Sequence, residues 1–358
     1  MTTKTRRSRS RSNGFKVHWR GGINDYVTDL GWSPEGDYLA VSSSSGDVGL
    51  WQETELVSLE TDQADGAINC LGFSADSHYL AAAGQRGEVF IWSVQKRDQA
   101  PTLLCNTNCW IDRMSWHPAE PWLAFGVGSQ VQVWDAAQGK LLTQFDFAKS
   151  SVLSLDWHPQ GHLLAVSGHT GVKVWSRDDW AAEPEFIEVP GASISVAWSP
   201  DGRYLASGNL DRTLTVVSWG NPPPWLMQGF PGKVRQVSWA ATMENQPSLV
   251  AAACLEGVTV WHRQDKGWEN RVLQHHGQTV AAISFHPTTR LLASAGQDGQ
   301  LCLWQNAKSL QQTLKGVASG FSAIAWHPQG MYLAAGGDQG EIIIWKPTNR
   351  GQGFSVSN

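Results

Sequence analysis

Hydrophobic and polar positions follow one pattern that recurs along most of the chain. Each unit has an apolar strand ending in an aromatic residue, a Pro/Gly turn, a Leu-Ala strand of small residues, a polar turn and a strand ending in Trp. The first aromatic column recurs every 41 to 46 residues and contains Trp32, Phe73, Trp116, Trp157, Trp198, Trp239, Phe285 and Trp326. The second contains Trp51, Trp92, Trp134, Trp175, Val217, Trp261, Trp304 and Trp345. This period is typical of four-stranded propeller blades, and eight units predict an eight-bladed ring.

An outer strand follows the second column in most units. Seven such strands are expected, at residues 56–59, 103–105, 141–145, 186–189, 226–228, 272–274 and 310–314. The eighth has to come from elsewhere, and Phe15, Val17 and Trp19 alternate with polar residues at strand period. We therefore predict an all-β fold: a single eight-bladed β-propeller of four-stranded antiparallel blades, whose last blade is closed by an N-terminal strand beside residues 342–345. Residues 354–356 are the alternative source, which the Pro and Gly residues before them disfavour.

Three units carry insertions. The fourth is extended after Trp175, the fifth contains Pro222–Pro224, and the sixth has a longer first turn at residues 240–248. The three prolines are expected to form a stiff spacer. Insertions of this kind are common in exposed loops, and partner binding is the alternative explanation.

The two ends of the chain differ in composition from the repeats. We expect the propeller to span residues 15–346, between a disordered basic Arg/Ser tail at residues 1–14 and a flexible tail at residues 347–358. The first tail supplies five positive charges, from Lys4, Arg6, Arg7, Arg9 and Arg11. Because the whole chain has a formal charge of −5, the remainder carries −10. An alternative role for the four tail arginines is attraction to nucleic acid or to an acidic partner.

The most complete unit, which ends with residues 280–304, resembles the WD-repeat family. The family's Gly-His pair, Leu-Ala-Ser strand, Asp-Gly turn and closing Trp are matched by His276, Ser294, Asp298 and Trp304, with His275 in place of the Gly. These four side chains can satisfy one another's hydrogen bonds inside a blade. The resemblance implies a propeller fold but no particular activity, because propellers carry unrelated functions.

Candidates for catalysis and metal binding are few. There is no nucleophile elbow and no phosphate-binding loop. His117, His158, His286 and His327 recur at one turn position, so we expect them to form turns rather than a metal site. The five cysteines have no regular spacing, and Cys105 and Cys109 lack a second ligand pair for zinc. We therefore predict no enzyme, cofactor or metal, no membrane span, and a cytoplasmic protein.

The remaining candidate is a partner-binding surface. The four strands of each unit are called a to d in chain order, d being the outer strand. The resemblance implies that partners bind the face that carries the loops from strand d to strand a and the turns from strand b to strand c. Tyr26 and Trp110 directly precede strand a in their units and lie outside both aromatic columns. With nearby loop residues they form the candidate partner-binding set Tyr26, Asp65, Arg86, Trp110, Lys149 and Lys233. The alternative is that the side chains of Tyr26 and Trp110 are buried and fill the centre of the ring.

From these observations we expect a non-catalytic scaffold that binds one or more proteins through one rim of the propeller. An enzyme or small-molecule binder that uses the central channel remains open, as does a nucleic-acid-associated factor guided by Arg6, Arg7, Arg9 and Arg11.

Overall fold

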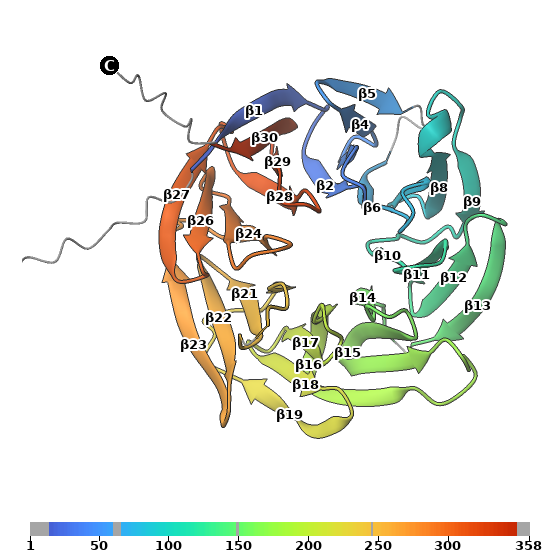
Figure 1. Cartoon of the computed structure of the whole chain (residues 1–358). Helices are drawn as coiled ribbons and strands as arrows, with labels where there is room; N and C mark the ends of the chain where they lie inside the picture. Colours follow the sequence, from blue (N-terminus) through green and yellow to red (C-terminus); the bar gives the residue numbers. More distant parts are fainter. Residues whose placement is uncertain (1–13, 60–65, 148–149, 245, 349–358) are drawn as a thin grey trace, which may run out of the picture.

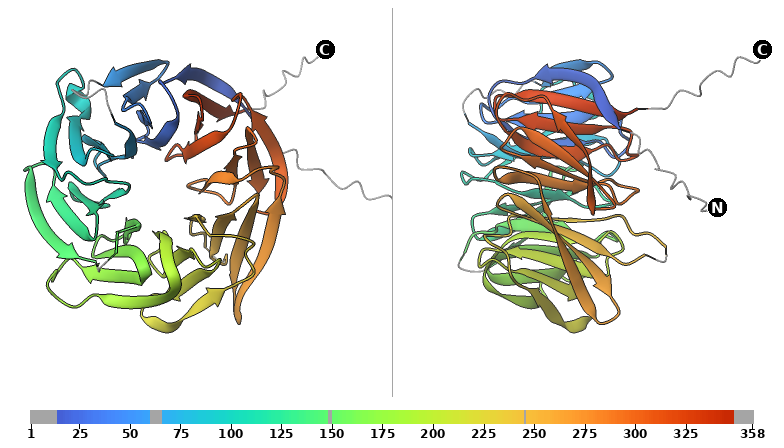
Figure 2. Two further views of the ribbon diagram at one scale, coloured as in Figure 1. Left: turned by 180° about the vertical axis from the view of Figure 1, so that it is seen from behind. Right: turned by 90° about the vertical axis from the view of Figure 1, so that its left-hand side faces the viewer.

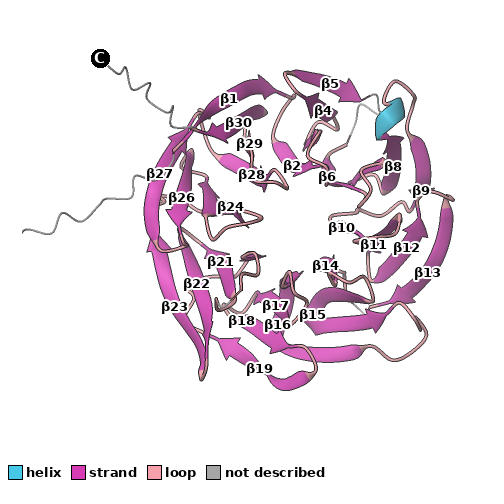
Figure 3. Cartoon of the chain, in the orientation of Figure 1, coloured by secondary structure: helices cyan, strands magenta, loops and turns pink. Residues whose placement is uncertain are grey.

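The computed structural model describes residues 14–59, 66–147, 150–244 and 246–348, which form a ring of β-sheets about a common axis (Figure 1). The two predicted tails lie outside the described residues except for Gly14, Pro347 and Thr348. Each blade has strands a to d from the inside outward, and Figure 3 shows that strands dominate the ring.

The first three blades are separate four-stranded antiparallel sheets. Blade 1 contains β2 (Val27–Trp32), β3 (Leu39–Ser43), β4 (Val48–Gln52) and β5 (Glu55–Leu59). Blade 2 contains β6 (Ile68–Phe73), β7 (Tyr79–Gly84), β8 (Glu88–Ser93) and β9 (Thr102–Asn106), with the 3₁₀ turn η1 (Val94–Lys96) between the last two. Blade 3 contains β10 (Met114–Trp116), β11 (Trp122–Val127), β12 (Gln130–Asp135) and β13 (Lys140–Asp146).

Blades 4 and 5 share one six-stranded sheet. It contains β14 (Ser154–Trp157), β15 (Leu163–Ser176), β16 (Glu185–Trp198), β17 (Tyr204–Asn209), β18 (Leu214–Ser218) and β19 (Asn221–Met227). The long strand β15 supplies strands b and c of blade 4, and β16 runs from strand d of blade 4 into strand a of blade 5. The repeat pattern predicted separate sheets here, but strand pairing continues across both junctions, with a register shift in each and a left-handed φ of 81° at Gly191.

The last three blades are again four-stranded. Blade 6 contains β20 (Gln236–Trp239), β21 (Leu249–Cys254), β22 (Gly257–Gln264) and β23 (Gly267–Gln274). Blade 7 contains β24 (Val280–Phe285), β25 (Leu292–Gly296), β26 (Gln300–Gln305) and β27 (Ser309–Lys315). Blade 8 contains β28 (Phe321–Trp326), β29 (Leu333–Gly337), β30 (Glu341–Pro347) and the N-terminal strand β1 (Phe15–Gly22).

The N-terminal strand occupies the position that the sequence predicted for it. In Figure 2, β1 lies along the outer edge of the blade formed by the last strands of the chain. It pairs antiparallel with β30, with Val17 opposite Trp345. The backbone N–H and C=O of Phe15 bond to the side-chain amide of Gln312 at 2.7 and 2.8 Å, which ties β1 to blade 7 as well. A register shift after Val17 interrupts the predicted alternation and leaves that side chain 40% exposed.

The sequence prediction for Pro222–Pro224 is wrong. These residues lie in β19, the outermost strand of blade 5, rather than in a spacer between strands. Proline lacks a backbone donor, and an edge strand has one side on which no donor is needed. Strand pairing is irregular beside the prolines, between Val216 and Ser218.

The first aromatic column fills the interfaces between blades. The indole N–H groups of five of its six tryptophans donate to backbone carbonyls in strand a of the preceding blade, in the pairs Trp32–Ala325 (3.2 Å), Trp116–Gly72 (2.8 Å), Trp157–Ser115 (3.2 Å), Trp239–Ala197 (3.0 Å) and Trp326–Ser284 (3.1 Å). The indole N–H of Trp198 is buried and has no partner among the described residues. Each of the bonded tryptophans therefore adds both buried apolar area and a directional bond between neighbouring blades.

The recurring histidines link blades in the opposite direction. Nδ1 of each accepts a hydrogen bond from the backbone two residues later, which is the turn role expected from the sequence. Nε2 bonds to a glycine carbonyl of the next blade, in the pairs His117–Gly161, His158–Gly202, His286–Gly330 and His327–Gly36. All four glycines have left-handed φ values, between 69 and 89°. The last of these pairs joins blade 8 to blade 1.

Candidate functional site

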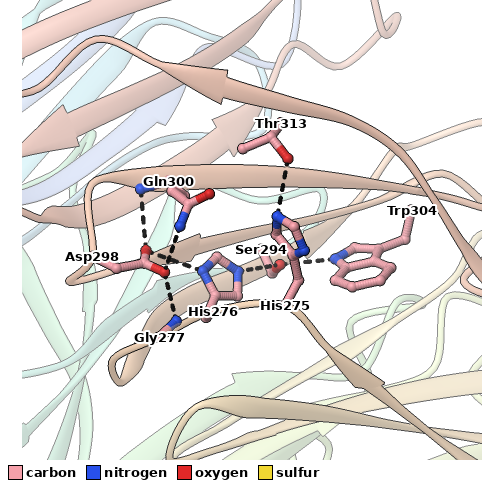
Figure 4. A network of polar contacts seen from close by, with 8 residues as sticks. All are labelled: His275, His276, Gly277, Ser294, Asp298, Gln300, Trp304 and Thr313. Carbon is pink, nitrogen blue, oxygen red and sulfur yellow. Dashed lines mark hydrogen bonds and ion pairs between the residues drawn. The ribbon is translucent and has the colours of Figure 1, made fainter.

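Blade 7 contains a continuous chain of polar contacts (Figure 4). The indole N–H of Trp304 donates to Ser294 Oγ at 2.9 Å, and Ser294 Oγ lies 2.8 Å from His276 Nε2. His276 Nδ1 is 3.2 Å from Asp298 Oδ1. Since the serine hydroxyl accepts from the indole, it is free to donate to Nε2, which leaves the imidazole proton on Nδ1 facing the carboxylate.

Asp298 gathers several donors at the end of this chain. The backbone N–H of Gly277 donates to it at 2.8 Å, and the backbone N–H of Gln300 donates at 3.1 Å. Burial acts to raise the pKa of Asp298, but these bonds and the one from His276 together hold it below its usual value. The carboxylate is therefore a structural anchor of the turn.

Blades 1, 2 and 6 lack this network because the serine is absent. Val41, Ala82 and Ala252 occupy the strand position of Ser294 in blades 1, 2 and 6. In those blades the indole N–H groups of Trp51, Trp92 and Trp261 are buried and have no partner among the described residues. Blade 5 keeps a serine, Ser207, but has Val217 in place of the tryptophan, and this serine bonds to Ser193 and Asn209 instead. The chain of contacts through His276 and Asp298 therefore belongs to the structure of blade 7.

We expect Asp298→Ala to lower the free energy of unfolding by about 1 to 3 kcal/mol, because it leaves a buried imidazole without its acceptor. Asp338→Ala is the matched control, a b-to-c turn carboxylate of blade 8 without the histidine chain. Urea unfolding midpoints measure both effects. Equal shifts for the two variants would show that the hydrogen bonds of His276 contribute no stability.

The face formed by the d-to-a loops and b-to-c turns, called the top face below, exposes several large apolar side chains. Trp110 is 63% exposed, which is inconsistent with a buried plug. The hydroxyl of Thr107 bonds to Gly87 O and Cys109 O and so fixes the loop that carries it. Tyr26 is 39% exposed and bonds to the Ser322 side chain. Burial, with a smaller contribution from Asp338, raises the pKa of Tyr26, so its hydroxyl is a neutral donor.

Two residues of the candidate set meet in one cavity. Tyr26 and Lys233 both line a hollow of about 740 Å³, called the top-face hollow below. Its lining also includes Leu210, Arg212, Arg235 and Leu255, from blades 5 and 6. The sequence did not single out these four. One of them, Arg212, could have been found from the sequence, because other units have Gly at its position in the b-to-c turn.

The other members of the candidate set are not brought together there. Arg86 lies between blades 1 and 2, where its guanidinium forms an ion pair with Glu88 at 3.3 Å. Trp110 lies on blade 3 and does not line the hollow. Asp65 and Lys149 lie outside the described residues. The opposite face has a hollow of about 980 Å³, whose lining carries both signs of charge in Arg203, Arg263, Glu244 and Asp265.

Two half-buried aspartates form hydrogen bonds between neighbouring blades. Asp29 Oδ2 accepts from the backbone N–H of Leu71 at 3.1 Å, and Asp156 Oδ2 accepts from that of Trp198 at 2.8 Å. Each bond runs from strand a of one blade to strand a of the next. Burial raises the pKa of Asp29 to about 6 and that of Asp156 to about 7, although the backbone donors act to lower both.

The pKa of Asp156 predicts a pH-dependent stability. The folded protein holds this proton more tightly than the unfolded chain, whose carboxyl pKa is near 3.9, so stability falls by up to about 1.4 kcal/mol per pH unit as pH rises between those two values. We expect Asp156→Asn to remove this decline. Urea midpoints at pH 5 and pH 8 measure it, and an unchanged slope in the variant would contradict the assignment.

Metal and membrane features are not found in the part of the chain that the structure describes. No group of three or more His, Cys, Asp or Glu residues there could hold a metal ion. No helix in the same residues is long and apolar enough to cross a membrane.

Comparison with known proteins identifies the family. The family model WD domain, G-beta repeat matches residues 13–52, 55–93, 139–176, 188–218, 267–305 and 308–346. These segments cover more than half of the chain, which belongs to the WD40 repeat family. The model detects six repeats rather than the eight units predicted from the sequence. The two longest unmatched segments, residues 94–138 and 219–266, contain β9 to β12 and β19 to β22, so the structure shows blade strands there as well.

Two curated fungal proteins share a limited match. Nuclear distribution protein nudF from Aspergillus flavus and its counterpart from Aspergillus oryzae are each 28% identical to this chain over 103 residues. The match spans 28% of this chain and 22% of each relative, so the compared segment is a small part of both.

Proposed function

We propose that the protein is a non-catalytic scaffold that binds a partner protein through the top face of the propeller. The observation that carries the proposal is Trp110, a 63%-exposed aromatic side chain held by an ordered loop on that face. Aromatic anchors of this kind dominate the energetics of protein interfaces. Tyr26, Leu210 and Leu255, each about 40% exposed, add apolar surface to the same face.

The alternative of an enzyme that uses the central channel has less support. The half-buried carboxyl groups of Asp29 and Asp156 accept backbone hydrogen bonds between blades. The recurring histidines are likewise engaged with glycine carbonyls of the next blade. Catalysis requires groups that converge on a substrate, whereas these groups are distributed around the ring.

The test compares partner binding by two double variants. Trp110→Ser with Tyr26→Ser removes the top-face aromatics, and Phe186→Ser with Val272→Ser removes side chains of similar exposure, 49 and 55%, from the outer strands. We expect capture of the native partner from cell extract to weaken at least tenfold for the first pair only, since loss of an aromatic anchor costs about 2 kcal/mol or more.

A photo-crosslinking amino acid at position 110 or 186 provides a second measurement on the same proteins. Crosslinks to a partner are expected at position 110 and not at 186. Equal capture by both double variants, together with no crosslink at position 110, would overturn the proposal. The tail alternative predicts instead a salt-sensitive binding to nucleic acid that is lost when residues 1–13 are deleted.

A further inference from the structure

The top-face hollow has an unusual charge for this protein. Arg212, Lys233 and Arg235 all line it and are exposed, whereas no Asp or Glu is among its lining residues. None of the three cations forms an ion pair with a carboxylate within the described ranges. The chain as a whole has a formal charge of −5. Three uncompensated cations at one hollow of an acidic protein favour a negatively charged ligand.

Arg212 occupies a backbone position that disfavours arginine. It lies in the b-to-c turn of blade 5, three residues after Asn209 ends strand b, and has a φ of 69°. Glycine stands at this position in blades 1, 2, 7 and 8, with φ of 93, 76, 70 and 85° at Gly46, Gly87, Gly299 and Gly340. A side chain in the left-handed region is strained, and glycine forms this turn without strain. The arginine is therefore unfavourable for the turn itself, which points to a role for its side chain.

Leu255 repeats this conflict in the next blade. It has a φ of 47° in the b-to-c turn of blade 6 and is 43% exposed, although it is apolar and branched. Leu210, in the b-to-c turn of blade 5, is 42% exposed. Tyr26 contributes an aromatic ring and a neutral hydroxyl to the same lining. The hollow thus combines three cations with three exposed apolar or aromatic side chains.

We infer that the top-face hollow binds an acidic peptide segment of the partner protein, and this inference rests on the proposed scaffold function. Carboxylates of the segment bind Arg212, Lys233 and Arg235, with arginine able to form paired hydrogen bonds to one carboxylate. An apolar side chain of the segment packs against Leu210, Leu255 and Tyr26. A volume of about 740 Å³ accommodates a few side chains rather than a folded domain.

The experiment uses the full chain and a defined probe. The probe is a fluorescein-labelled, 12-residue peptide with four Glu and two Leu among Ser and Gly, and the control peptide has Gln in place of Glu. Fluorescence anisotropy titrations at low and physiological salt measure both dissociation constants. We expect the Glu peptide to bind at least tenfold more tightly than the Gln peptide, with a preference that decreases as salt increases.

Arg212→Gly separates binding from folding. Because glycine suits the left-handed turn, we expect a melting temperature equal to or above that of the original protein, together with at least tenfold weaker binding of the Glu peptide. Lys233→Gln with Arg235→Gln should weaken binding similarly. Lys140→Gln with Lys266→Gln is the charge-matched control, since both lysines are exposed at c-to-d turns of the opposite face, and its affinity should not change.

Equal affinity for the two peptides, no binding of the Glu peptide, or unchanged affinity in both hollow variants would overturn the inference. These outcomes are distinct from failure of the scaffold proposal. If crosslinks form at position 110 and capture depends on Trp110 and Tyr26 while Arg212→Gly has no effect, the scaffold stands and the acidic ligand is wrong.

Discussion

Deletion of residues 1–20 is expected to lower the free energy of unfolding by several kcal/mol, whereas deletion of residues 1–13 leaves it unchanged. The longer deletion removes most of β1, including Phe15, which is 8% exposed and packs edge-on against Trp326 with ring centroids 5.6 Å apart. It also removes Trp19, which is partly buried against the core of blades 1 and 8. Full burial of a large apolar side chain is worth about 1.5 to 3 kcal/mol. The deletion also exposes the backbone donors and acceptors of β30.

Guanidinium unfolding of the two truncated proteins and the full chain measures this difference. The deletion of residues 1–13 is the control, because it removes no residue of β1 and none of its pairing with β30. If both truncated proteins unfold at the same denaturant concentration, β1 does not stabilise the ring.

Gly202→Ala is expected to destabilise the protein by about 3 kcal/mol or more. A Cβ atom at this position lies 2.1 Å from His158 Nε2, and the φ of 69° adds the cost of a left-handed side chain. Gly139→Ala is the matched control: φ there is 61°, but nothing lies within 4 Å of the new Cβ. We expect the control to cost only about 1 to 2 kcal/mol.

A double-variant cycle assigns the excess to the histidine. In a His158→Ala background the clash partner is gone, so the additional cost of Gly202→Ala should fall toward that of Gly139→Ala. Urea unfolding midpoints measure all four proteins. An unchanged cost in the His158→Ala background would mean that the inter-blade contact does not limit this position.

The sequence carried most of the information about the blades and little about how they meet. Trp32 and Trp326 belong to the first aromatic column. Its spacing alone predicts the repeat, because strand a of each unit ends in one large side chain. The indole N–H groups of these two residues bond to the preceding blade only because of the angle between neighbouring sheets. The spacing of the column carries no information about that angle. The same holds for the bonds from His158 and His327, which the sequence indicated only as turn residues.

The candidate site was predicted in part for a similar reason. Tyr26 and Lys233 stand at one position of the repeat, so the sequence placed them on one face. It could not show that blades 5 to 8 and blade 1 bring them to a single hollow with Arg212 and Arg235. The net charge of the sequence also gave no indication of the top-face hollow, because the whole chain is acidic whereas the hollow is lined by basic residues.

The pairing of β1 with β30 sets a condition on synthesis in the cell. Strand β1 must wait for a partner that lies about 330 residues later in the chain. At an elongation rate of roughly 5 to 20 residues per second, this delay is about 15 to 65 s. During that time β1 has no neighbour and the edge of the growing ring stays open to other chains. Closure of the ring by β1 therefore takes place only after β30 has been synthesised.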